Sequence, residues 1–212
     1  MRTPDSLADT LVAQFDHALR TLAGNSSAQR ENPAVGIAET ELSSHELKHA
    51  AGLMRVNHTG EICAQALYEG QALTASDTRT RNALKTAASE ETDHLAWCEE
   101  RLEELDSRPS VFNPVFYALS YVMGALTGLM GDRISMGFVE ATEDQVCKHL
   151  SKHLDTLPEA DARSREIVKK MHEDEARHGA EALAAGGAEF PEPVKQAMSV
   201  LSKLMTETTY HL

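Results

Sequence analysis

Two Glu-x-x-His pairs carry the chemistry that this sequence suggests. Glu91 lies three residues before His94, and Glu175 lies three residues before His178. Side chains with this spacing share one face of an α-helix, so each pair would present a carboxylate and an imidazole to the same point in space. Oxygen and imidazole ligands together suit iron or manganese.

A lone glutamate precedes each pair at a similar distance along the chain. Glu61 comes thirty residues before Glu91, and Glu143 comes thirty-two residues before Glu175. The residues lie on apolar stripes with the three- and four-residue spacing of buried helix faces. Four converging carboxylates must take up protons or bind cations, and two divalent ions would balance them. We therefore expect the ligands of two metal ions to be Glu61, Glu91, His94, Glu143, Glu175 and His178.

Other acidic residues and histidines are assigned outside this site. Glu140 lies one turn before Glu143 and could replace or assist it, although Glu143 is in better register with the neighbouring apolar residues. The third Glu-x-x-His pair, Glu46 and His49, has no upstream glutamate, and we expect it to be a solvated surface pair. We expect surface positions for Glu90, Asp93, Glu99, Glu100, Glu103, Glu104, Glu173 and Asp174.

The elements that position these ligands are predicted to be helices. Aromatic residues make up only 5% of the chain, no alternation of strand length is present, and the apolar residues are mostly good helix formers. Ser44 is the predicted N-cap of the helix that carries Glu61, and Gly124, Gly128 and Gly131 are expected to bend a longer one. The predicted helices are residues 5–23, 44–74, 77–105, 114–157, 160–185 and 191–205.

These helices predict an all-α fold. One glutamate from each of two helices and Glu-x-x-His from each of two others is the ligand pattern of ferritin-like metal proteins. The expected fold is thus a ferritin-like four-helix bundle with additional N- and C-terminal helices. We divide the chain into an N-terminal helix and linker at residues 1–43 and a bundle domain at residues 44–212.

Charge and cysteine content restrict the function classes. The net charge of −13 argues against nucleic-acid binding, which needs a basic surface. The three cysteines form no C-x-x-C motif and suggest no disulfide framework, as in a reducing compartment. No signal peptide is visible, so we expect a cytoplasmic location.

Residues 111–131 are free of charged side chains. Pro114 and three glycines interrupt the apolar run, which weakens the interpretation as a true membrane span; a buried core helix and attachment to one leaflet remain. Gly124 and Gly128 form a G-x-x-x-G spacing, which could instead serve helix packing or self-association.

Four segments resemble one known family. They are Arg55–Glu61 (R-V-N-H-T-G-E), Ala66–Ala72 (A-L-Y-E-G-Q-A), Glu91–Leu95 (E-T-D-H-L) and Asp174–His178 (D-E-A-R-H). They are similar to the demethoxyubiquinone hydroxylases of ubiquinone biosynthesis, in particular those of bacteria. The resemblance covers about residues 45–212, and the family's metal ligands fall on the same six positions.

The resemblance implies a di-iron monooxygenase with two iron ions per chain. It would hydroxylate the ring of a polyprenylated methoxybenzoquinol, with O2 and with electrons from a reductase, NADH or the quinol. It also implies peripheral association with the cytoplasmic side of the inner membrane, and a homo-oligomer or a complex with other ubiquinone-biosynthesis proteins. The alternatives are a ferritin-like iron-binding or ferroxidase protein and a bundle without metal. The resemblance assigns no catalytic residue beyond the ligands.

Overall fold

The computed structural model describes residues 7–24 and 26–212, and all regular elements in them are α-helices. The prediction of an all-α fold is confirmed. Residues 5 and 6 of the first predicted helix lie outside the described part. The helices are α1 (Leu7–Ala23), α2 (Ser44–Thr74), α3 (Thr78–Glu104), α4 (Asn113–Leu129), α5 (Asp132–Thr156), α6 (Ala162–Ala184) and α7 (Glu192–His211).

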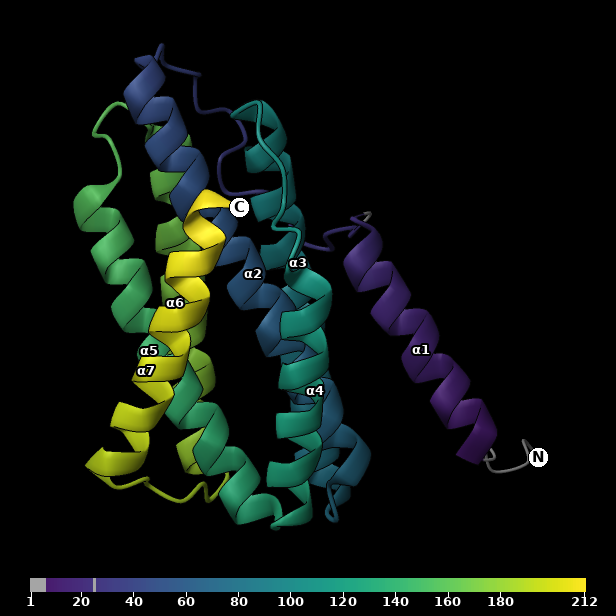
Figure 1. Cartoon of the computed structure of the whole chain (residues 1–212). Helices are drawn as coiled ribbons and strands as arrows, with labels where there is room; N and C mark the ends of the chain where they lie inside the picture. The colour runs from purple at the N-terminus through teal and green to yellow at the C-terminus, as the bar shows by residue number, and fades with distance from the viewer. Residues whose placement is uncertain (1–6, 25) are drawn as a thin grey trace.

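Helices α2, α3, α5 and α6 form the ferritin-like bundle. Met54, Cys98, Leu150 and Met171 come one from each of these helices, and all four are buried in the same core cluster. Burial of a side chain of this size stabilises the fold by about 1.5–3 kcal/mol. Helix α7 lies across this bundle, and α1 stands at its side (Figure 1). The predicted four-helix core with N- and C-terminal additions is therefore confirmed.

The prediction of one bent helix over residues 114–157 is wrong. The chain forms two helices there, α4 and α5, which run in opposite directions (Figure 1). Gly131 separates them with φ 104°, a conformation that favours glycine because it has no Cβ. The Asp132 carboxylate accepts hydrogen bonds from the backbone of Ser76 and Asp77, which fixes the turn against the end of α2.

Glycines allow α4 to pack closely against α2 within the same chain. A Cβ at Gly124 would collide with the carbonyl oxygen of Leu67, and a Cβ at Gly70 would collide with that of Tyr121. The G-x-x-x-G spacing thus serves packing of α4 on α2, one of the two uses that the sequence left open.

The start of α2 corrects two details of the sequence interpretation. Its N-cap is Ser43, not Ser44, and Ser43 forms a capping box with Glu46. His49 is half-buried and lies 2.6 Å from the Tyr210 hydroxyl through its Nδ1 atom. Glu46 and His49 therefore serve the helix start and the docking of α7, and they do not form a solvated pair. Helix α7 itself continues to His211, beyond the predicted end at 205.

We expect Gly124→Ala to lower the free energy of unfolding by about 1–3 kcal/mol, because the added methyl group overpacks the α2–α4 contact. Gly60→Ala is the matched control, since a Cβ at this position in α2 meets nothing within 4 Å. The control should gain up to about 1 kcal/mol from helix propensity. Denaturant unfolding followed by circular dichroism measures both, and equal midpoints for Gly124→Ala and the unmodified chain would contradict the packing argument.

Candidate metal centre

The bundle brings all six predicted ligands together in its interior. Ligand atoms of Glu61, Glu91, His94 and Glu175 lie within 4.8 Å of one another, and the same holds for Glu91, Glu143, Glu175 and His178. All six side chains are buried. The two groups share Glu91 and Glu175, which therefore stand between two possible ion positions. Each position keeps one further glutamate and one histidine of its own.

The histidines turn their Nδ1 atoms toward the shared carboxylates. His94 Nδ1 lies 3.1 Å from Glu91 Oε2 and 3.0 Å from Glu175 Oε1. His178 Nδ1 lies 3.2 Å from Glu91 Oε1 and 3.2 Å from Glu175 Oε2. This convergence follows from the Glu-x-x-His spacing on α3 and α6, which places both side chains of a pair on the inner face of the helix.

Two buried carboxylate oxygens of the cluster have no hydrogen-bond partner. They are the two oxygens of Glu143. An unpartnered carboxylate in a protein interior is costly unless it is protonated, paired or bound to a metal. The donor set of four carboxylates and two imidazoles therefore fits two cations such as ferrous iron.

When no metal is bound, protons on the glutamates and histidines of the cluster offset the negative charge. Burial raises the pKa of Glu61 and of Glu143 well above that of an ordinary glutamate. Burial opposes the charged forms of the histidines as well, but hydrogen bonds to carboxylates override it and raise the pKa of His178 to about 12 and that of His94 far above its usual value. Metal binding must displace these protons, because imidazole and carboxylate bind metal in their deprotonated forms.

The structure places Glu140 outside the cluster. Its carboxylate lies 3.3 Å from Lys195 Nζ on α7, whereas Glu143 faces the shared carboxylates. The preference for Glu143 over Glu140 thus agrees with the geometry, because one helical turn separates an inner face from a face that meets α7.

Two acidic residues that we assigned to the surface hold the outer ring nitrogens. His94 Nε2 lies 3.0 Å from Asp174 Oδ2, and His178 Nε2 lies 2.9 Å from Glu90 Oε2. Asp174 and Asp93 are buried, so the surface prediction is wrong for both of them, while Glu90 is half-buried. Such carboxylates fix the ring orientation and leave Nδ1 free for metal. The signal for these two partners was the acidic residue directly before Glu91 and before Glu175.

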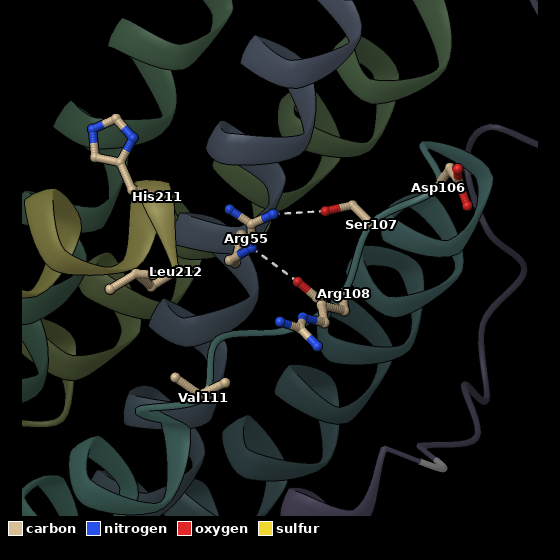
Figure 2. A pocket seen from close by; sticks show the side chains of 7 residues that line it. All are labelled: Arg55, Asp106, Ser107, Arg108, Val111, His211 and Leu212. Carbon is tan, nitrogen blue, oxygen red and sulfur yellow. Dashed lines mark hydrogen bonds between the residues drawn. The ribbon is translucent and has the colours of Figure 1, made fainter.

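Arg55, the first residue of the R-V-N-H-T-G-E segment, lies outside the cluster and has a structural role. Arg55 donates hydrogen bonds to the Arg108 carbonyl at 2.9 Å and to the Ser107 hydroxyl at 2.6 Å, as Figure 2 shows, and to the Tyr210 carbonyl at 2.8 Å. It lines a pocket of about 440 Å³ beside the C-terminal Leu212. Arg55 therefore ties the α3–α4 loop and the chain end to α2.

The fold and the cluster define a ferritin-like protein with a buried centre of carboxylates and histidines that could hold metal ions. The chain matches the family described as "Ubiquinone biosynthesis protein COQ7" over residues 48–209. Curated relatives from Ectopseudomonas mendocina (strain ymp) and Azotobacter vinelandii (strain DJ / ATCC BAA-1303) are each 58% identical to it over 208 residues. That alignment covers 98% of this chain and 97% of each relative, and both relatives are named 3-demethoxyubiquinol 3-hydroxylase. The chain belongs to the COQ7 family, which confirms the resemblance found in the sequence.

We expect Glu143→Gln to lose at least one equivalent of bound Fe(II), because an amide removes a charged ligand from one ion position. Glu140→Gln is the matched control one turn away and should bind metal as the unmodified chain does. Anaerobic addition of Fe(II), removal of free metal and iron analysis give the stoichiometry. Iron loss in Glu140→Gln with full binding in Glu143→Gln would reverse the assignment.

Proposed function

We propose that this chain is an O2-dependent di-iron monooxygenase that hydroxylates the ring of 3-demethoxyubiquinol in ubiquinone biosynthesis. The observation that carries the proposal is the pair of buried ligand groups that share Glu91 and Glu175. The names of relatives at 55–58% identity over nearly the full chain supply the substrate.

In this proposal two iron ions occupy the cluster. Glu61 and His94 would hold one, Glu143 and His178 would hold the other, and Glu91 and Glu175 belong to both groups of candidate ligands. Bound iron would supply the O2 chemistry there, with electrons from a reductase, NADH or the quinol itself. Asp174 and Glu90 keep the Nε2 protons of the histidines in place, and the buried surroundings limit access of water.

The two alternative functions are less well supported. A metal-free structural bundle would have to bury Glu143, neither of whose oxygens has a hydrogen-bond partner, in its protonated form. An iron-storage protein would need polar outer helix faces, whereas α4 exposes a continuous apolar stripe. The relatives' names also point to a hydroxylase.

The apolar stripe on α4 supports attachment to a membrane surface. Val115, Leu119, Val122, Leu126 and Leu129 follow one another at three- and four-residue spacing, and each is more than half exposed. The interpretation of this segment as an ordinary core helix is therefore wrong. Among the described residues, no helix is both long and apolar enough to cross a membrane. A helix with this pattern can lie in the interface of one leaflet.

We place the protein on the cytoplasmic side of the inner membrane, where a polyprenylated quinol is dissolved. Three free cysteines fit a reducing compartment. Helix α1 exposes a second apolar group, Val12, Phe15 and Leu19, which could add to the membrane contact or bind another protein of the same pathway. A homo-oligomer is the other assembly that these surfaces permit.

Complementation tests the proposed activity. A bacterial strain blocked at this hydroxylation accumulates the demethoxy quinone, and we expect the chain to restore ubiquinone. Glu175→Ala should restore none, because it removes a ligand shared by both ion positions, whereas Glu103→Ala at an exposed position on α3 should restore it fully. Quinone extraction and chromatography give the readout. Failure of the unmodified chain, or rescue by Glu175→Ala, would contradict the proposal.

Glutamate substitutions on α4 test the membrane surface. Leu126→Glu and Leu129→Glu should weaken binding to liposomes and raise the KM for long-tailed quinols, because they place a charge on the apolar stripe. Leu204→Glu on α7 replaces a similarly exposed leucine and is the control. Iron content and turnover of a short-tailed quinol should remain close to normal in all three variants. Equal liposome binding by all three and by the unmodified chain would exclude this stripe as the attachment site.

A further inference from the structure

The two Glu-x-x-His pairs differ in how their outer carboxylates are held. Residues 90–94 read Glu-Glu-Thr-Asp-His, and residues 174–178 read Asp-Glu-Ala-Arg-His. The second segment contains its own arginine, Arg177, whose Nη2 lies 2.5 Å from Glu90 Oε2. That same oxygen accepts the hydrogen bond from His178. In the first segment the position of Arg177 is occupied by Asp93, so this pair has no arginine of its own.

An arginine from the segment between α1 and α2 takes this role for the first pair. Arg30 Nη1 lies 2.7 Å from Asp174 Oδ2, the oxygen that also contacts His94 Nε2 at 3.0 Å. Arg30 Nε lies 2.5 Å from Asp93 Oδ2. Asp93 therefore binds the guanidinium of Arg30, a residue outside the bundle helices, beside the first pair, as Arg177 lies beside the second pair.

Further contacts fix the position of Arg30. The backbone N–H of Gln29 donates to Asp93 Oδ1 at 2.6 Å, and the Arg30 guanidinium lies 5.0 Å from the centre of the Trp97 ring. A cation over an aromatic face gains further attraction. The planar guanidinium can contact two carboxylates at once, whereas a lysine ammonium is a single point of charge.

We propose that Arg30 is a positioning residue for one of the two ion positions, the one formed by Glu61 and His94. It orients Asp174, which orients the His94 ring and directs Nδ1 toward the shared carboxylates. The inference rests on the proposed two-metal centre. It makes the two ion positions inequivalent, because the arginine that contacts the partner of His178 is Arg177 of α6 itself, whereas Arg30 comes from outside the bundle. The segment before α2 thereby becomes part of the centre.

A Co(II) titration of the metal-free protein tests the assignment. We expect Arg30→Gln to weaken one of the two bound equivalents about 10- to 100-fold, the usual range for loss of an outer partner of a metal ligand, and to leave the other unchanged. Proton NMR of the Co(II)-loaded protein should show one shifted, solvent-exchangeable Nε2–H signal for each bound histidine. Only the His94 signal should move or exchange faster in Arg30→Gln, and Arg30→Lys should recover part of the loss.

Two controls separate positioning from general stability. Glu90→Gln replaces the partner of His178 Nε2 and should affect the His178 signal and the other equivalent, which also assigns the two resonances. Glu39→Gln breaks a second tie of the same segment, to Arg101 at 2.8 Å, without touching a ligand, and should change neither signal. If Arg30→Gln does not fold, Arg30→Gln combined with Asp93→Asn removes the unpaired buried charge and tests the same point.

Three results would overturn the inference. Unchanged Co(II) binding and unchanged signals in Arg30→Gln would show that Arg30 has no influence on the centre. Equal weakening of both equivalents, or the same effect in Glu39→Gln, would show that the segment acts only through the stability of the fold. An unmodified chain that binds fewer than two equivalents would instead refute the two-metal centre itself, and this inference with it.

Discussion

The burial of four carboxylates at one level of the bundle is the constraint on which the rest of the structure depends. Glu61, Glu91, Glu143 and Glu175 come from four different helices and lie in an interior that excludes water. Such a group is tolerated only if positive charge accompanies it, as protons or as metal ions. The raised pKa values of Glu61, Glu143 and both histidines show the protonated form of this balance. Cations that displace these protons would stabilise the folded chain, because the unfolded chain has no such site.

Alternating opposite charges continue from the cluster toward the surface of the bundle. His94 and His178 each donate through Nε2 to the acidic residue directly before the opposite Glu-x-x-His pair, and each of these carboxylates contacts an arginine. The acidic composition of the chain is therefore partly internal, because Asp93 and Asp174 are buried in ion pairs and are not solvated. Their desolvation is offset by charge-assisted hydrogen bonds that also give the centre a defined geometry.

Helix α4 links the centre to the outer surface of the protein. Its glycines bring one face against α2, the helix that carries Glu61, while the opposite face exposes the apolar stripe. The hydroxyl of Tyr117, on the buried side of α4, donates to Glu69 of α2 at 2.7 Å. The two faces of α4 are therefore separate: one packs on the helix that carries Glu61, and the other exposes apolar side chains.

The sequence by itself determined the helical class, the four ligand-bearing helices and the six residues that meet in the cluster. Periodicity sufficed because a helix face is set by local spacing, so a carboxylate on an apolar stripe must enter the interior. Only the tertiary structure decided the break at Gly131 and the burial of Asp93 and Asp174. The break depends on a backbone conformation that a glycine permits but does not require. Both buried aspartates contact Arg30, which lies more than sixty residues before either of them, and no local pattern encodes a contact over that distance.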